Sequence, residues 1–299
     1  MSGPHDHRLR HAHQVAGDAL GNVGVSSPRL EVVRVGTSIL LAAVPDGVLV
    51  RVEDRGDASS ARRQIAVGRY LASVGVPAVV PLADIDQPFV TDAGAVTLWQ
   101  LEQLVPTEVA PATLGSLARA LHNATTDAGT IDGLPRLDPL GAAFTQLAIA
   151  GVHTLDDIGA ELASRWASTT SGLQMGLVHG DLHPGNVLVT PRGPVLADLE
   201  LAGVGPVAYD LVPPVVAVRR YGESARSLAD YVTAYGAPIP RAARHGVLRD
   251  VYEFWLTAWS LANRHLDGRH ELEARRRLAR WTPVPLGAGP IGTPHWSLL

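Results

Sequence analysis

The stretch Leu177-Val178-His179-Gly180-Asp181-Leu182-His183-Pro184-Gly185-Asn186-Val187-Leu188-Val189 decides how this sequence is interpreted. It places a carboxylate, Asp181, and a side-chain amide, Asn186, five positions apart between two short apolar runs. The apolar runs predict strands, and Pro184 and Gly185 predict a loop between them. The sequence therefore predicts a loop that presents two oxygen-bearing side chains at a fixed spacing.

The spacing His-x-Asp-x-x-x-x-Asn suits the transfer of a phosphoryl group. That reaction needs a carboxylate that orients an attacking hydroxyl and accepts its proton, together with oxygen ligands for a metal that neutralises a triphosphate. We assign Asp181 as the base and His179 as the residue that braces the loop. Asn186 is the first candidate metal ligand.

A second carboxylate, Asp198, follows Asn186 by twelve residues and ends the apolar run 194–197. Residues 190–193 predict a turn, so Asn186 and Asp198 should lie at the outer ends of a hairpin and meet in space. Mg²⁺ takes one or two protein oxygen ligands in addition to substrate phosphates. The sequence therefore predicts Mg²⁺ bound by Asn186 and Asp198.

These motifs, together with Asp198-Leu199-Glu200 and residues 205–211, resemble the aminoglycoside phosphotransferase and choline kinase family of small-molecule kinases. The resemblance spans about residues 30–265. It implies an α+β, two-lobed protein-kinase-like fold with a β-rich N-lobe and a mostly helical C-lobe. It also implies ATP or GTP with Mg²⁺ as cofactors and a small-molecule hydroxyl as acceptor, and it gives Asp210 the role of fixing the catalytic segment through backbone N–H groups.

Two other functions compete with a kinase. His-x-Asp-x-His at residues 179–183 is also a candidate metal cluster, which would suit a metal-dependent hydrolase. A nucleotide-binding module without transfer activity is the second alternative. It is suggested because the chain contains no lysine, so the lysine that usually holds the nucleotide phosphates is missing.

The composition excludes several classes of protein. The chain has 299 residues, of which 46% are hydrophobic, and a net charge of -4, so neither nucleic acid nor an anionic membrane is an expected partner. Cysteine is absent, which removes disulfides, thiol catalysis and cysteine-ligated zinc. No apolar run approaches the roughly 20 residues of a membrane span, and the first residues lack a secretory signal. We expect a cytoplasmic enzyme, and its oligomeric state stays open.

Three segments divide the chain. We expect a polar, solvated arm at residues 1–27, with helix from Arg8 to Leu20, a nucleotide-binding N-lobe at 28–104, and a catalytic, acceptor-binding C-lobe at 105–299.

The N-lobe segment begins with three predicted strands and a helix. Residues 30–35, 39–44 and 48–52 predict antiparallel strands, and 58–74 predict a helix. The turn that contains Gly36, Thr37 and Ser38 is expected to cover the phosphates with backbone N–H groups.

Arg51 and Gln64 stand where the family has a strand lysine and a helix glutamate. We expect Arg51 to bind the phosphates without a carboxylate to orient it, and the side-chain carbonyl of Gln64 to accept one of its N–H groups.

Residues around Gln100, Glu102 and Leu104 resemble the family's hinge, in which the backbone holds the purine ring. Backbone recognition requires no particular side chain, so ATP and GTP both remain open.

The second half of the chain predicts mostly helices, including one over residues 241–266. Asp250 and Glu253 share one face of that helix, and we expect the acceptor to lie against it. The resemblance implies an aminoglycoside, and hence antibiotic resistance, among the candidate acceptors. Residues 105–299 contain 18 acidic residues and 16 arginines, which is a small excess for attracting a polycation. Macrolides, sugars, amino alcohols and other metabolites therefore remain open as acceptors.

Overall fold

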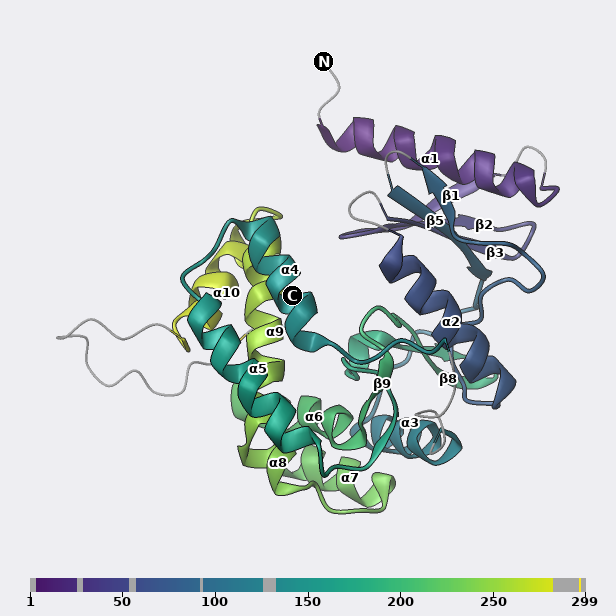
Figure 1. The fold of residues 1–299 in the computed structure, drawn as a ribbon. Coiled ribbons are helices and arrows are strands. Elements are labelled where there is room, and N and C mark those ends of the chain that lie inside the picture. Colours follow the sequence, from purple (N-terminus) through teal and green to yellow (C-terminus); the bar gives the residue numbers. More distant parts are fainter. Residues whose placement is uncertain are drawn as a thin grey trace. The chain divides into compact units, whose positions relative to one another are not determined.

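The structure is a computed structural model that describes residues 4–25, 29–53, 58–91, 94–125, 133–281 and 296. The chain forms two compact units (Figure 1). Unit 1 is made of Met1–Thr107, Gly133–Pro135 and Val187–Glu200, and unit 2 is made of Glu108–Asp132, Arg136–Asn186 and Leu201–Leu299. The expected C-lobe included residues 187–200, but this segment packs with unit 1.

Unit 1 is built on an antiparallel five-stranded sheet in the order β1-β2-β3-β5-β4. Its strands are β1 Leu30–Val35, β2 Ile39–Ala43, β3 Val48–Glu53, β4 Phe89–Thr91 and β5 Gly94–Gln100, and helix α2 spans Ser59–Ser73. The three expected strands and the following helix are thus confirmed. Burial alternates along β3, where Val48, Val50 and Val52 enter the core and Arg51 lies on the opposite face.

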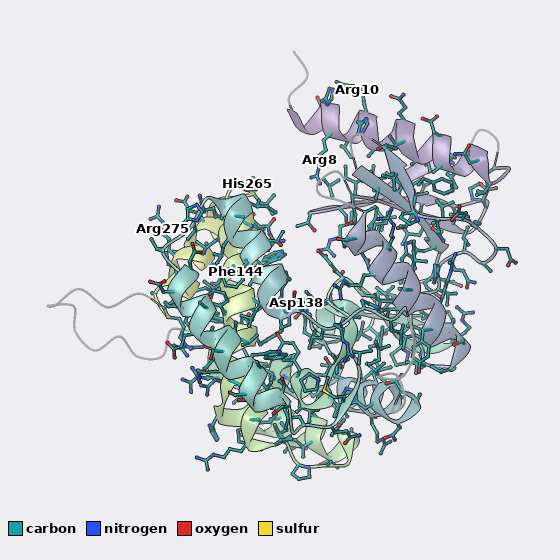
Figure 2. All side chains as sticks on the ribbon, in the orientation of Figure 1. Arg8, Arg10, Asp138, Phe144, His265 and Arg275 are labelled. Carbon is teal, nitrogen blue, oxygen red and sulfur yellow. The ribbon has the colours of Figure 1, made fainter. Side chains whose placement is uncertain are left out.

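Helix α1, Pro4–Asn22, covers the valine face of this sheet. Its buried residues recur at helical spacing and are Ala12, Val15, Ala16, Ala19 and Leu20. The expectation of a solvated arm is therefore wrong, because the valine face needs an apolar cover. At the exposed edge of the helix, Arg8 donates a hydrogen bond to the carbonyl of Thr37 (Figure 2).

The predicted hairpin of unit 1 is confirmed. Strands β7, Val187–Thr190, and β8, Gly193–Leu196, pair antiparallel through a two-residue turn. Backbone bonds join it to the rest of unit 1, from Val79 N–H to the Leu196 carbonyl at 2.8 Å and from Val105 N–H to the Val189 carbonyl at 2.8 Å. The hairpin thereby carries Asp198 and Glu200 to the edge of unit 1.

Unit 2 is mostly helical (Figure 1). Its helices are α3 Pro111–Ala124, α4 Pro139–Ala150, α5 Asp156–Thr170, α6 Val212–Arg220, α7 Ala225–Tyr235, α8 Arg241–His245, α9 Val247–Asn263 and α10 Gly268–Leu278. Strands β6, Met175–Val178, and β9, Gly203–Pro206, form a small antiparallel pair, and 3-10 turns span Pro184–Asn186 and Val207–Leu211.

The predicted helix over residues 241–266 is interrupted at Gly246. This glycine is extended, with ψ of -165°, and separates α8 from α9. A Cβ at residue 246 would lie 2.8 Å from the carbonyl oxygen of Ala242, so only glycine fits this close turn. Helix α9 runs through the bundle, where Phe144 of α4 packs edge-on against its Phe254 (Figure 2). No helix among the described residues is both long and apolar enough to cross a membrane.

Candidate active site

The loop after β6 is fixed by a buried carboxylate. Asp210 is fully buried and accepts the backbone N–H of His179 at 2.7 Å and that of Gly180 at 2.8 Å. His122 lies 3.2 Å from the same carboxylate. Gly180 has a φ of 84°, and a Cβ there would come within 2.9 Å of Leu201. Asp210 therefore has the structural role that the resemblance implied, and it sets the course of the chain into Asp181.

Asp181 receives a short hydrogen bond from Tyr252 of α9. The Tyr252 hydroxyl donates to Oδ1 at 2.6 Å, and Nε2 of His183 lies 3.7 Å from Oδ2. Burial raises the pKa of Asp181, but His183, Tyr252 and His179 lower it by more, so that the net pKa lies below its usual value. Asp181 is consequently ionised and oriented, as a proton acceptor must be.

The two histidines of the loop stabilise its backbone. The Asp181 N–H donates to Nδ1 of His179 at 3.3 Å, and the Gly185 N–H donates to Nδ1 of His183 at 3.1 Å. Because Nδ1 accepts a hydrogen bond in both rings, Nε2 is the nitrogen that carries a hydrogen. The described residues contain no group of three or more metal-ligating side chains. These contacts favour the bracing role of His179 over a metal cluster at residues 179–183.

Asn186 ends the 3-10 turn of the loop and is buried. Its side-chain Nδ2 donates to the backbone carbonyl of Asp181 at 2.9 Å. This bond orients the amide and makes Oδ1 the atom that could bind a cation.

In unit 1, Arg51 lies among three carboxylates. Its Nε donates to Glu53 at 3.0 Å, and its terminal nitrogens lie 3.7 Å from Asp198 and 3.5 Å from Glu200. Burial lowers the pKa of Arg51, but Asp198, Glu200 and Glu53 raise it by more. Arg51 thus faces the hairpin that bears Asp198, on the side of β3 away from the valine core.

The predicted hydrogen bond between Gln64 and Arg51 is wrong, because Gln64 bonds to Glu53 instead. Gln64 donates through Nε2 to Glu53 Oε1 at 2.8 Å and to Ser60 Oγ at 3.1 Å. Arg51 therefore does have a carboxylate to orient it, and Gln64 holds that carboxylate instead of accepting from the guanidinium. Sequence reasoning missed Glu53, although its position two residues after Arg51 places both side chains on one face of β3.

Asp198 has two properties that suit a cation ligand. It adopts a positive φ of 57°, and its Oδ1 is buried without a hydrogen-bond partner. Such a buried oxygen is costly unless a cation or donor satisfies it. Arg51 is near, but it lies at 3.7 Å and not at hydrogen-bond distance.

The predicted phosphate turn is partly engaged by its own backbone. The Gly36 N–H donates to the Ser38 carbonyl at 3.0 Å, so it does not point outward as expected. The Thr37 carbonyl accepts from Arg8. For Thr37 and Ser38 the phosphate-binding role stays a prediction.

The predicted hinge follows β5. The Gln100 N–H donates to the Val80 carbonyl at 2.9 Å, which removes this donor from base recognition. Nη2 of Arg192 donates to both carboxylate oxygens of Glu102, at 2.9 and 2.8 Å. Within the described part of the chain, no backbone hydrogen bond uses the Leu104 N–H, and Leu104 is 57% exposed.

Asp250 and Glu253 do not form the exposed acidic face that was expected. Glu253 is fully buried and hydrogen-bonds to Arg220 at 2.6 Å and Arg280 at 3.0 Å. Asp250 is bonded to Arg165 and Arg249. Both carboxylates are already neutralised, so neither is available to a cationic acceptor. Tyr252, between them in sequence, is the α9 residue that reaches Asp181, and no local pattern indicates a partner 71 residues away.

Comparison with known proteins decides the family. A family model described as "Phosphotransferase enzyme family" matches residues 37–247. The chain belongs to this phosphotransferase family. The match contains Asp181, Asn186, Asp198 and Asp210 but ends before Tyr252. No curated protein matches the sequence.

Solved structures show the same fold. A choline/ethanolamine kinase family protein from Mesorhizobium loti aligns with a TM-score of 0.62 at 21% identity, over 92% of this chain and 96% of that chain. An aminoglycoside phosphotransferase from Streptomyces rimosus aligns with a TM-score of 0.57 at 17% identity, over 78% and 95%. The choline kinase LicA in complex with AMP aligns with a TM-score of 0.59 at 13% identity, over 90% and 98%. The α+β kinase-like fold expected from the sequence is thereby confirmed, and the family makes the protein a small-molecule phosphotransferase.

Proposed function

We propose that this phosphotransferase moves the γ-phosphoryl group of ATP or GTP to a hydroxyl group of a small molecule. The observation that carries the proposal is Asp181, held ionised by Tyr252 and His183 on a loop that Asp210 fixes. The acceptor oxygen bonds to the γ-phosphorus while the bond from that phosphorus to the β–γ bridging oxygen breaks. The acceptor proton passes to Asp181, and the nucleoside diphosphate leaves.

The proposed metal ligands are Asp198 and Asn186. The buried, unbonded Oδ1 of Asp198 and the oriented amide of Asn186 are hard oxygen donors of the type that Mg²⁺ takes. When bound, Mg²⁺ supplies positive charge to the phosphate oxygens. Arg51 supplies a further cation, and Glu53 and Gln64 fix the direction of its guanidinium.

Backbone groups are proposed to complete nucleotide binding. Thr37 and Ser38 offer N–H groups to the phosphates, while Glu102 and Leu104 offer a backbone acceptor and donor to the base. The AMP complex of LicA, which has the same fold, supports a nucleotide in this role. The alternative of a binding module without transfer rests on the missing lysine and glutamate, and the Arg51–Glu53 pair supports transfer because it offers a cation and a carboxylate in their place.

An acceptor panel tests the proposal. The protein is incubated with Mg²⁺, ATP or GTP, and hydroxyl compounds that include aminoglycosides, amino alcohols, sugars and hydroxy acids. Mass spectrometry then searches for an acceptor heavier by one phosphoryl group, with one nucleoside diphosphate formed per product. Nucleotide binding without any phosphorylated acceptor across the panel would favour the binding module.

A further inference from the structure

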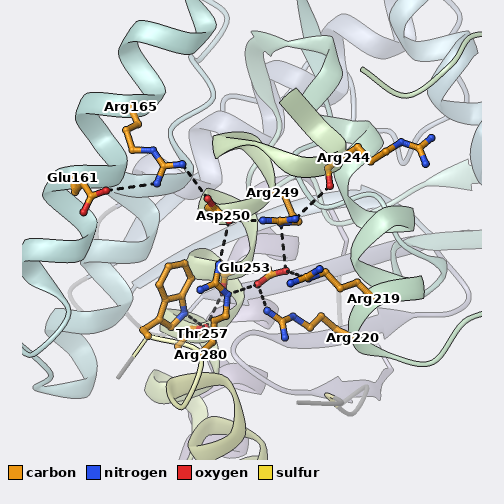
Figure 3. Close-up of polar contacts among 11 residues, drawn as sticks. Glu161, Arg165, Arg219, Arg220, Arg244, Arg249, Asp250, Glu253, Thr257 and Arg280 are labelled. Atoms are coloured by element: carbon orange, nitrogen blue, oxygen red, sulfur yellow. Dashed lines mark hydrogen bonds and ion pairs between the residues drawn. The ribbon is translucent and has the colours of Figure 1, made fainter. Parts of the chain in front are cut away.

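Arginine side chains surround two carboxylates of α9 (Figure 3). Glu253 is bonded to Arg220 and Arg280, and Asp250 is bonded to Arg165, Arg249 and Arg280. Arg219 adds an ion pair to Glu253 at 3.7 Å. We call these five side chains the arginine cluster: Arg165, Arg219, Arg220, Arg249 and Arg280.

The arginine cluster contains more positive charge than its partners balance. Besides Asp250 and Glu253, the only described carboxylate that pairs with it is Glu161, 3.7 Å from Arg165 and 72% exposed. Three carboxylates therefore face five guanidinium groups. Excess charge in a partly buried group is costly unless an ion of opposite sign is present. The cluster is thus a place where an anion would be stabilised.

Arg219 is the arginine of the cluster that is most able to bind an anion. Its ion pair with Glu253 is too long for a hydrogen bond, it makes no hydrogen bond to any described residue, and it is 42% exposed. Burial lowers the pKa of Arg219, and the positive charges of Arg249, Arg220 and Arg280 lower it further against the opposing effect of Glu253. Nearby, the buried Nε atoms of Arg220 and Arg249 also have no hydrogen-bond partner.

The arginine cluster adjoins the reactive carboxylate within unit 2. Arg249 precedes Tyr252 by three residues, or about 4.5 Å along α9, so the two side chains lie on neighbouring positions of one face. Tyr252 bonds directly to Asp181. Tyr221 follows Arg219 by two residues, and its pKa is raised to about 12 by burial and, among other charges, by Asp181 and Glu253 against the effect of Arg277. The pKa of Tyr221 therefore depends both on Asp181 and on Glu253, the carboxylate that the cluster surrounds.

We propose that the arginine cluster binds a carboxylate or phosphate group of the acceptor, which makes the acceptor an anionic hydroxyl compound and not a polycation. This inference rests on the proposed function, because it assumes that Asp181 receives the acceptor hydroxyl. The planar fork of Arg219 suits either anion, since both present paired oxygens. The acceptor carries its anion on the side of Tyr252 that faces Arg249.

The first test compares acceptors that share one carbon skeleton and differ at a single group. A hydroxy acid and its phosphate analogue are compared with the matching amide and amine, and the ratio of kcat/KM between anionic and neutral members is measured. Wild-type protein should favour an anion by about tenfold or more, as one charged hydrogen bond would. Arg219→Gln should remove most of that ratio by raising KM for the anionic members, and Arg219→Lys should restore part of it.

The matched control is Arg226→Gln, because Arg226 lies on α7 with 90% of its side chain exposed and loses the same charge. This control should leave the ratio unchanged. Preference for the amine, or an equal loss of the ratio in both glutamine variants, overturns the proposal. Relative preference for the carboxylate or the phosphate identifies which anion the cluster takes.

The second test is independent of turnover. Inorganic phosphate is titrated calorimetrically into the wild-type chain, Arg219→Gln and Arg51→Ala, without nucleotide. Binding should weaken about tenfold in Arg219→Gln and persist in Arg51→Ala. Binding that depends on Arg51 alone, or on neither residue, contradicts the anion site. Phosphate binding that depends on Arg219 in a protein that phosphorylates no acceptor would reject the proposed function and retain the anion site.

Discussion

Replacing Arg51 by alanine should change metal binding and nucleotide binding in opposite directions. The substitution removes the positive charge 3.7 Å from the Oδ1 of Asp198. Two unit charges at that distance interact by about 1 kcal/mol in water and about 4 kcal/mol at an effective dielectric constant of 20. Asp198 is 34% exposed, so solvent screening favours the lower figure. Because Arg51 then no longer competes with Mg²⁺ for the Asp198 carboxylate, Mg²⁺ binding should strengthen about fivefold.

The same variant should bind nucleotide more weakly. A lost charged hydrogen bond to a phosphate costs about 1.5–3 kcal/mol, or a factor of about 10–150 in affinity. Calorimetry measures both effects, with Mg²⁺ titrated alone and nucleotide titrated at saturating Mg²⁺. Arg29→Ala is the control, because Arg29 is 80% exposed and pairs only with Glu31 among the described residues. Parallel losses of metal and nucleotide affinity, or no change in either, would refute the assignment of Arg51 to a shared site with Asp198.

Three further substitutions test other contacts. Asp198→Asn should abolish Mg²⁺-dependent transfer, because an amide binds Mg²⁺ far more weakly than a carboxylate. The circular dichroism spectrum should stay unchanged. Near-normal turnover at ordinary Mg²⁺ would remove Asp198 from the site. Tyr252→Phe removes the 2.6 Å hydrogen bond to Asp181. It should lower kcat about tenfold or more with little change in nucleotide affinity. An unchanged kcat would mean that Asp181 is oriented without the Tyr252 hydroxyl. Asp210→Ala removes two charged hydrogen bonds to backbone N–H groups and should lower the free energy of unfolding by about 3–6 kcal/mol. Urea denaturation measures this loss, and a loss below about 1 kcal/mol would contradict the role of Asp210.

Local sequence patterns were sufficient to predict much of the fold. The strands around Pro45-Asp46-Gly47, the hairpin at residues 187–196 and the loop motif all have turn residues and apolar periods that act over short distances. The direction of Arg51 followed from the alternation along β3 once its valines were placed in the core. The histidines and arginines of helix α1 favour a solvated arm, but the helix also has a buried face, whose residues recur at helical spacing: Ala12, Val15, Ala16, Ala19 and Leu20.

Contacts between residues far apart in the sequence could not be predicted from local sequence patterns. Tyr252 meets Asp181 across 71 residues, and nothing in the α9 sequence distinguishes that tyrosine from a core aromatic. Glu253 was expected on a polar face, but packing of α6 and residue 280 against α9 buries it among arginines. The contact between Gln64 and Glu53 is different, because alternation along β3 already places Glu53 on the same face as Arg51. Tertiary packing thus determined which polar residues of the site meet.

Asp181 is proposed to serve transfer and not nucleotide binding, and Asp181→Asn separates these two roles. The variant is compared with the wild-type chain by calorimetric titration of nucleotide at saturating Mg²⁺ and by the rate of acceptor phosphorylation. A positioned general base contributes about 10²–10⁴ in rate, so kcat should fall by that factor while the nucleotide dissociation constant stays within about threefold. Loss of nucleotide affinity and turnover together, or turnover that survives, would show that Asp181 is not the base.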